Sequence, residues 1–358
     1  MKVQAHQLFF PAAALYAAIA PWFLLAYLAS GKPQVVSSAV HARGLLFGYV
    51  GALIAGYLLG RTRLPILMLL FSLWLAGRLL ELSHADTLPA SLLYALFGLL
   101  LAALVTPKFR AAKKWRNRVA GPLIALVTCY PLLDQALRIH GITPRIAIQG
   151  VILPLALLLF FMGGRIITPA LAVAYAARGE RLPQRVQPAI EGMTIALLLL
   201  ASATYLLAPQ SRWPGIPVVV AGTLVLLRLY RWKLFALNWR SADIWALGAG
   251  YCWLGLGLLA VGCDAGRPVA GWTSLHVITI GALGTLSCTV MLRLGCKRRP
   301  AAAGWYCAIY LLLALAVTGR VLADWMPGAR EMLLAFTATL WSLNFVAVGW
   351  LLTVRAGH

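Results

Sequence analysis

Two histidines, His41 and His276, each stand near the start of a long apolar segment, and the two segments lie far apart in the chain. His41 precedes LLFGYVGALIAGYLLG, and His276 lies within SLHVITIGALGTLSCTVMLR. An ionisable side chain inside a membrane-spanning segment is costly in free energy unless it has a partner, so it marks a candidate functional site. If the two imidazoles lie at the same depth, they could hold one cofactor between two helices.

The composition predicts that the elements carrying these histidines are membrane-spanning helices. Hydrophobic residues make up 62% of the chain, the mean hydropathy is +0.85, and only 11% of residues are charged, whereas soluble domains carry about 25% charged residues. About twelve apolar runs approach or reach the roughly 17–25 residues that a spanning helix needs. They lie at 8–29, 44–60, 64–82, 88–106, 119–137, 146–163, 190–208, 215–232, 243–262, 272–294, 303–323 and 331–354.

The loops between these runs are short and leave no room for a soluble domain. We therefore expect residues 1–358 to form a single integral membrane domain, an all-α polytopic transmembrane helix bundle that contacts the lipid bilayer. Most of the 31 Lys and Arg residues fall in the loops on the side of the N-terminus, and short loops rich in Lys and Arg stay in the cytoplasm. Both termini are therefore predicted to be cytoplasmic, and the net charge of +22 indicates this orientation rather than nucleic-acid binding.

This orientation predicts that His41 and His276 lie in the outer third of the membrane, on the second and tenth spans. Two arginines, Arg78 and Arg320, fall in the outer halves of the third and eleventh spans. A haem needs axial ligands from facing helices and cations that neutralise its propionates. The pattern thus predicts a haem whose iron is bound by His41 and His276, with Arg78, Arg320 and Arg43 as further cofactor-binding residues.

Each of these residues also has a structural interpretation. A single histidine at a helix end is commonly an interfacial polar residue. Arg78 and Arg320 could extend their charged ends to the membrane interface, or they could pair with Glu81 and Asp324. These alternatives stay open at the level of the sequence.

Glycines near both histidines allow the same two interpretations. Gly44 and Gly48 follow His41, and small residues in spanning helices commonly allow close helix packing. Gly281 and Gly284 follow His276, and they would remove side-chain bulk beside the imidazole, which suits a flat macrocycle.

Four blocks of the chain resemble the NnrS family. They read HARGLLFGYVGALIAGYLL at 41–59, FMGGRIITPAL at 161–171, IWALGAGYCW at 244–253 and SLHVITIGALGTLSCTVMLRLGCKRR at 274–299. The last block, with its HxxTxGAxGT pattern, is the most specific. The resemblance covers most of the chain and implies a haem- and copper-binding protein of the bacterial cytoplasmic (inner) membrane that is linked to nitric oxide.

The sequence also departs from the family pattern. His41 and His276 stand where the family has histidine, but three other family histidines are replaced by Arg43, Gly248 and Cys296. A second, inner metal site for copper would thus lack its imidazoles, although Cys296 could offer a thiolate. The resemblance therefore implies a divergent member that keeps one b-type haem and has lost copper.

Three classes of function stay open. The first is a haem-b protein connected with nitric oxide stress, respiration or denitrification, with a respiratory electron-transfer partner. The second is a transporter or a metal or haem assembly factor, in which the glycine- and proline-rich segments 143–154 and 212–218 could be broken helices beside a substrate path. The third is a structural protein whose metal sites have decayed. The sequence contains no HExxH, P-loop or GxSxG motif in a fitting context, and it leaves open whether any reaction is catalysed.

Overall fold

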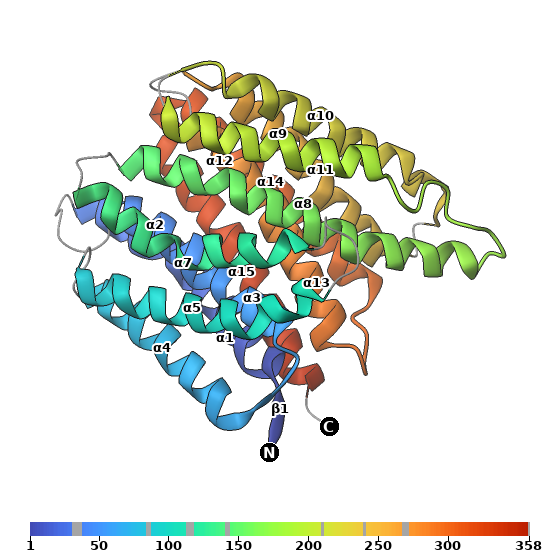
Figure 1. Ribbon diagram of the computed structural model, residues 1–358, viewed down its shortest axis with the longest axis horizontal. Helices are drawn as coiled ribbons and strands as arrows, with labels where there is room; N and C mark the ends of the chain where they lie inside the picture. The colour runs from blue at the N-terminus through green and yellow to red at the C-terminus, as the bar shows by residue number, and fades with distance from the viewer. Residues whose placement is uncertain are drawn as a thin grey trace. The chain divides into compact units, whose positions relative to one another are not determined.

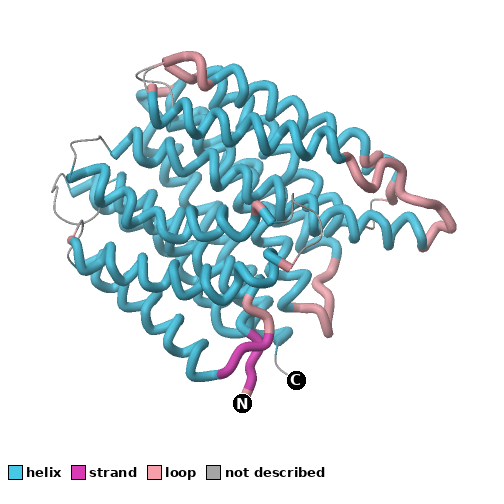
Figure 2. The backbone as a smooth tube through the Cα atoms, viewed as in Figure 1, coloured by secondary structure: helices cyan, strands magenta, loops and turns pink. Residues whose placement is uncertain are grey.

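The computed structural model describes residues 1–30, 38–83, 87–111, 118–139, 144–208, 211–238, 241–266 and 272–356. Figure 1 and Figure 2 show that these residues are mostly helical, with short connecting loops. The contacts divide the chain into two compact units, which are described one at a time. Unit 1 comprises Met1–Val151, Met291–Pro300 and Ser342–His358, and unit 2 comprises Ile152–Val290 and Ala301–Trp341. A single integral membrane domain stays a prediction.

Unit 1 begins with a short strand and contains the first spanning helices. Its elements are β1 (Lys2–Gln4), α1 (Ala5–Ser30), α2 (Ser38–Arg43), the π-helix η1 (Gly44–Tyr49), α3 (Val50–Leu58), β2 (Arg61–Arg63), α4 (Leu64–Ser83), α5 (Leu88–Arg110) and α7 (Ala120–Ile139). Three helices contribute residues to both units, namely α8 (Pro144–Ala176), α13 (Thr285–Gly295) and α15 (Arg330–Ala356).

Unit 2 contains the remaining elements. They are α9 (Pro188–Leu207), α10 (Gly215–Arg231), the 3-10 helix η2 (Leu234–Ala236), α11 (Ala242–Cys263), α12 (Trp272–His276), the π-helix η3 (Val277–Gly284), α14 (Ala303–Trp325) and the 3-10 helix η4 (Pro327–Ala329). Each unit thus contains one span that a π-helix interrupts, and each interrupted span carries one of the two candidate histidines.

The predicted all-α polytopic bundle is confirmed. Within the described residues, nine helices are long and apolar enough to cross a membrane, so the chain is a multi-pass membrane protein. The predicted second, fifth and eighth spans are not among them. The second consists of α2, η1 and α3, and the fifth and eighth correspond to α7 and α10. The sixth span was predicted to end at 163, but α8 continues to Ala176. The two three-residue strands were not predicted.

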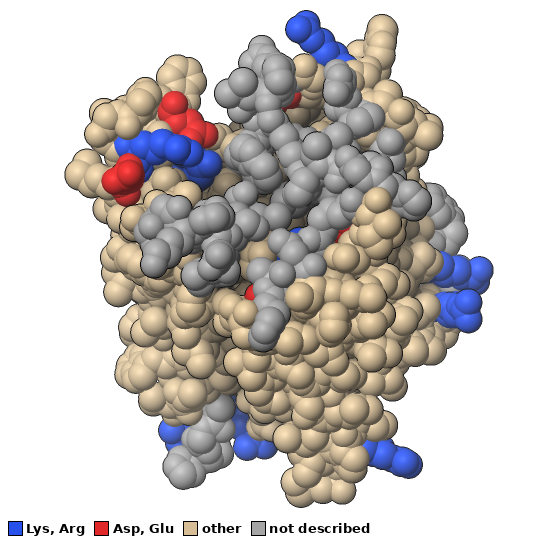
Figure 3. All heavy atoms as spheres, turned by 90° about the vertical axis from the view of Figure 1, so that its left-hand side faces the viewer, with Lys and Arg blue, Asp and Glu red and all other residues tan. Residues whose placement is uncertain are grey.

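The outer surfaces of the helices are apolar, as expected for contact with lipid. On α5, Leu88, Leu92, Leu96 and Leu99 form one exposed stripe, with exposed fractions of 45–55%. Soluble monomers rarely expose large contiguous apolar patches to water. An apolar stripe that faces the hydrocarbon of a bilayer carries no cost of exposure to water. Figure 3 shows one face of the molecule, on which uncharged residues cover most of the visible area outside the grey segments.

The first and last helices meet at one end of unit 1. A Cβ atom at Gly295 would contact the side chain of Leu352 near the end of α15, and it would lie 4.0 Å from Phe10 near the start of α1. The start of α1 and the end of α15 therefore lie at the same end of the unit. This arrangement agrees with the even number of spans expected from the sequence, in which both termini lie on one side of the membrane.

Glycine allows two helices of unit 1 to approach at backbone distance. A Cβ atom at Gly98 on α5 would meet the carbonyl group of Thr128 on α7, 2.6 Å from its carbon atom. The Thr128 hydroxyl donates a hydrogen bond to the Gly98 carbonyl oxygen at 3.2 Å. Membrane helices lack a strong hydrophobic force between them, so such close contacts supply much of their association energy.

We expect Gly98→Ala to destabilise the protein, because the new methyl group would meet backbone atoms that cannot rotate away. Overpacking of this kind costs about 1–3 kcal/mol, and it should lower the midpoint of thermal unfolding in detergent. The matched control is Gly349→Ala on α15, where the nearest atom would lie at an ordinary 3.6 Å. An equal effect of the two substitutions would contradict the close packing of α5 on α7.

Candidate functional site

His41 is positioned by the interrupted second span. It lies in the last turn of α2, is half-buried, and precedes the π-helix η1 by three residues. A π-helix has wider turns than an α-helix, and short π-segments within helices frequently occur at functional sites. The interruption therefore places His41 beside a segment in which the regular helical hydrogen bonding changes.

Two side chains of α4 bind the carbonyl groups of this π-helix. Trp74 donates from its indole Nε1 to the Gly48 carbonyl oxygen at 2.8 Å, and Arg78 donates from Nη1 to the Gly44 carbonyl oxygen at 3.3 Å. The two donors, Trp74 and Arg78, are four residues apart in sequence, and so are the two acceptors, Gly44 and Gly48. The two hydrogen bonds therefore lie about one helical turn apart along the same pair of helices. A Cβ atom at Gly48 would collide with the Arg78 guanidinium group, and glycine is therefore needed at this position.

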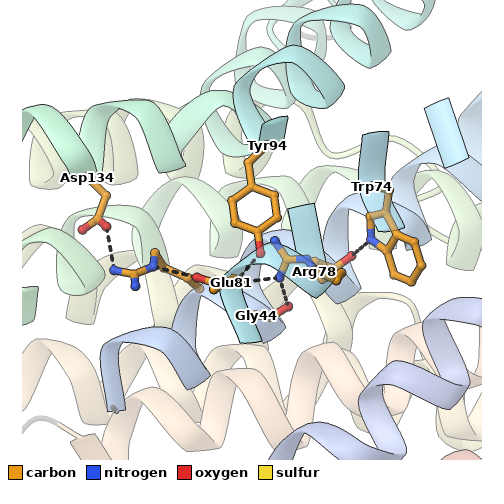
Figure 4. A network of polar contacts seen from close by, with 8 residues as sticks. Gly44, Trp74, Arg78, Glu81, Tyr94 and Asp134 are labelled. Atoms are coloured by element: carbon orange, nitrogen blue, oxygen red, sulfur yellow. Dashed lines mark hydrogen bonds and ion pairs between the residues drawn. The ribbon is translucent and has the colours of Figure 1, made fainter. Parts of the chain in front are cut away.

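A buried network of charges surrounds this contact, and Figure 4 shows Glu81 at its centre. Arg43 donates from Nε to Glu81 Oε1 at 3.0 Å and from Nη1 to Asp134 Oδ2 at 3.2 Å. Arg78 Nη1 lies 3.4 Å from Glu81 Oε2, to which the Tyr94 hydroxyl also donates. The network joins α2, α4, α5 and α7.

The charges of this network balance. Two guanidinium groups face two carboxylates, and all four side chains are at most 4% exposed. Isolated buried charges carry a large desolvation penalty, and removal of one partner from a buried pair costs about 3–5 kcal/mol. These arginines and carboxylates therefore hold the helix ends around His41 in place.

Arg78 keeps two donors that the network does not use. Its guanidinium carbon lies 3.6 Å from the centre of the Tyr94 ring and 5.6 Å from that of Tyr16. Its Nε and Nη2 atoms are buried, and neither has a hydrogen-bond partner within the part of the chain that the structure describes. Buried donors without a hydrogen-bond partner are rare in proteins. A bound group with acceptor oxygens is one explanation for the two donors of Arg78.

His276 occupies a corresponding place in unit 2. It ends α12, is half-buried, and is followed directly by the π-helix η3. Arg320 on α14 pairs with Asp324 at 2.9 Å, and Asp324 accepts a hydrogen bond from Thr273, one turn before His276. Asp324 thus connects Arg320 to the start of the helix that carries His276, and the pairing of Arg320 with Asp324 is one of the alternatives that the sequence left open.

The glycines after His276 are in contact with tryptophans. A Cβ atom at Gly281 would lie 2.8 Å from Trp253, and one at Gly284 would lie 3.0 Å from Trp341. These contacts support the packing interpretation of both glycines rather than an open space for a macrocycle.

The two positions tied to a copper site have ordinary surroundings. A side chain at Gly248 would collide with Leu234. The Cys296 thiol is buried and lies 3.8 Å from the Leu351 carbonyl oxygen as a hydrogen-bond donor, and burial raises its pKa, which disfavours the thiolate. Within the described residues, no group of three or more His, Cys, Asp or Glu side chains is placed to hold a metal ion.

The candidate residues, which the sequence assigns to depths in the membrane, are distributed between the two units. His41, Arg43, Arg78 and Cys296 belong to unit 1. The remaining candidates, His276 and Arg320 together with Gly248, belong to unit 2. In each unit an arginine–carboxylate pair lies near the histidine; the pairs of unit 1 are buried, whereas Asp324 in unit 2 is partly exposed.

Sequence reasoning missed a second buried cluster, which lies in unit 2. Arg228 is only 5% exposed; it pairs with Glu191 at 2.7 Å and donates to the Tyr251 hydroxyl at 3.0 Å. Its guanidinium carbon lies within 5 Å of the ring centres of Phe160 and Trp232. Arg228 lies within the predicted span 215–232 but was not among the candidate residues. The signal that could have revealed the cluster is Glu191, one of few carboxylates among many basic residues on the predicted cytoplasmic side.

Glu81→Gln should destabilise the protein by about 3–5 kcal/mol, because two buried guanidinium groups would then share one carboxylate. The midpoint of thermal unfolding in detergent measures this effect, with Glu331→Gln, at an exposed carboxylate, as the control. Because Arg43→Gln/Glu81→Gln restores the charge balance, the double variant should lose less stability than the sum of the single variants. Strict additivity would contradict the network.

Three comparisons with known proteins were made, and one of them gave a match. A search of curated proteins and a search of solved structures each found no match. The family model described as NnrS protein matches residues 3–354, which is essentially the whole chain. Since the match includes both interrupted spans and both histidines, the chain belongs to the NnrS family.

Proposed function

We propose that this chain is a haem-binding protein of the bacterial inner membrane, with one b-type haem whose axial ligands are His41 and His276. We further propose that it acts in nitric oxide stress or in respiratory or denitrification metabolism, and that both termini are cytoplasmic. Family membership supports the link to nitric oxide. Copper is not part of the proposal, because Gly248 and Cys296 have structural surroundings.

The observation that carries the proposal is the matched setting of the two histidines. Each lies in the last turn of the first helical segment of an interrupted span, each is half-buried, and a π-helix begins within three residues. Single interfacial histidines would have no reason to share this setting in two units. Axial ligation needs one imidazole from each of two helices, and the interrupted spans supply one each.

The surroundings of His41 also fit a haem. The buried Nε and Nη2 atoms of Arg78 have no hydrogen-bond partner within the described residues, and a propionate is an acceptor for such donors. The Arg43 guanidinium already binds Glu81 and Asp134, so we assign it a positioning role. In the same way, Arg320 orients the start of α12 through Asp324.

A haem with two imidazole ligands supplies one-electron transfer, since no open iron position is left for a substrate. The chain's own residues contribute the two imidazoles and the cation near the propionates. Both interrupted spans carry buried apolar side chains, such as Phe47 and Ile278. The proposed pair of imidazole ligands thus favours electron transfer over substrate turnover.

One observation favours the second candidate, a transporter or assembly factor. Matched interrupted helices in two parts of a membrane protein are a pointer to a transport site, and the spans with η1 and η3 are such a pair. The segments that the sequence indicated are not interruptions: residue 143 lies outside the described residues, residues 144–154 belong to the continuous helix α8, and α10 begins at Gly215. The transporter hypothesis therefore depends on the π-helices.

The proposal is tested by absorption spectra of the purified protein, oxidised and then reduced with dithionite. We expect sharp bands of a six-coordinate haem in the wild type, and the loss of these bands in both His41→Ala and His276→Ala. The matched control is His6→Ala in the first turn of α1, which should keep the spectrum. A colourless wild type, after expression with ample haem, would exclude the haem proposal and leave the transporter or assembly factor.

Arg78→Gln should lower the midpoint potential of the haem, because a buried positive charge that favours the reduced form is removed. A change of about 1 kcal/mol corresponds to roughly 40 mV for a one-electron couple. Spectroscopic redox titration measures the shift, and Arg228→Gln at the buried arginine of unit 2 serves as the control. An unchanged potential in Arg78→Gln would show that Arg78 does not act on the haem.

A further inference from the structure

The two short strands of unit 1 carry three arranged cations. In the antiparallel pair of β1 and β2, Lys2 lies opposite Arg63, and Gln4 lies opposite Arg61. Opposite residues share one face of a sheet, as do residues two apart in a strand. Lys2, Arg61 and Arg63 therefore lie on the same face, and all three are exposed.

This arrangement is unfavourable for the strand pair by itself, since like charges directly opposite each other destabilise a sheet. No carboxylate in the described part of unit 1 offsets it. The acidic residues there are Glu81 and Asp134, and both are buried against Arg43. Within the described part of unit 1, the positive face of the ribbon therefore has no carboxylate to offset its charges.

The ribbon lies where several membrane helices end. The Ala5 amide, which starts α1, donates to the Gly60 carbonyl oxygen at 2.9 Å, and the Leu64 amide, which starts α4, donates to the Met1 carbonyl oxygen at 3.1 Å. Gly60 itself has a φ of +66°, a left-handed conformation that glycine adopts without strain.

The end of α5 joins this surface. Lys108 donates to the carbonyl oxygens of Leu58 and Leu59, the latter at 3.0 Å, and so binds the end of α3. Arg110, two residues later, is exposed. Because the ends of spanning helices lie at the headgroup level, the ribbon and Arg110 present their charges to the membrane surface.

We propose that the face formed by Lys2, Arg61 and Arg63 binds the phosphate group of an anionic phospholipid in the leaflet next to the N-terminus. Arginine recognises phosphate oxygens through paired hydrogen bonds, and basic residues beside membrane helices are attracted to anionic lipids. A lipid rather than free phosphate is favoured because the face lies at the helix ends. The lipid phosphate would offset the like charges of this face and stabilise the junction of α1, α3, α4 and α5.

The test is a titration of the detergent-purified protein with phosphatidylglycerol, followed by native mass spectrometry. Parallel titrations use phosphatidylcholine and inorganic phosphate. Wild type should bind phosphatidylglycerol in preference to both. Arg61→Gln/Arg63→Gln should weaken the tightest phosphatidylglycerol site by roughly 30-fold, since each basic residue near an anionic surface contributes about 1 kcal/mol.

Three further variants separate an effect of charge from an effect on folding. Arg61→Lys/Arg63→Lys keeps the charges and should retain binding, whereas the single change Lys2→Gln should weaken it about fivefold, or 1 kcal/mol. Arg185→Gln/Arg330→Gln removes two exposed arginines from unit 2 and should leave the affinity unchanged.

Three results would overturn the proposal. The first is equal affinity of wild type for phosphatidylcholine and phosphatidylglycerol. The second is competition by inorganic phosphate at concentrations comparable to the lipid, which would identify a free anion as the ligand. The third is unchanged phosphatidylglycerol affinity in both Arg61→Gln/Arg63→Gln and Lys2→Gln.

Discussion

The ion pairs of Glu81 determine much of the structure around His41. This carboxylate accepts from Arg43, Arg78 and Tyr94, and Arg78 in turn binds the carbonyl group of the π-helix at Gly44. In a low-dielectric interior an incomplete set of partners would be severely destabilising. The network therefore fixes α2, α4, α5 and α7 together, and with them the place where the second span changes from α- to π-helix.

The same physical solution appears separately in each unit. A half-buried histidine precedes a π-helix in both, and arginine–carboxylate pairs hold the neighbouring helix ends, through Glu81 in unit 1 and Asp324 in unit 2. Glycines allow the close contacts that this requires, with Arg78 against Gly48 and Trp253 against Gly281. This shared setting of the two histidines is the observation on which the proposed function rests.

The helices were largely predictable, because long apolar runs are constrained by the thickness of a bilayer. The pairing of Arg320 with Asp324 was one of the alternatives that the sequence left open. The π-helices were not predicted, and in η1 the carbonyl groups of Gly44 and Gly48 accept from Arg78 and Trp74 of another helix. The Arg43–Asp134 pair and the Arg228 cluster likewise join residues that are distant in sequence, and no local pattern identifies such partners.

The most direct test of the central claim is low-temperature electron paramagnetic resonance of the oxidised, purified protein. Two imidazole ligands produce a strong ligand field, so the account predicts a low-spin ferric signal without a substantial high-spin component. A predominantly high-spin signal would show that at least one of His41 and His276 does not bind the iron. The absence of any ferric haem signal would contradict the account as a whole.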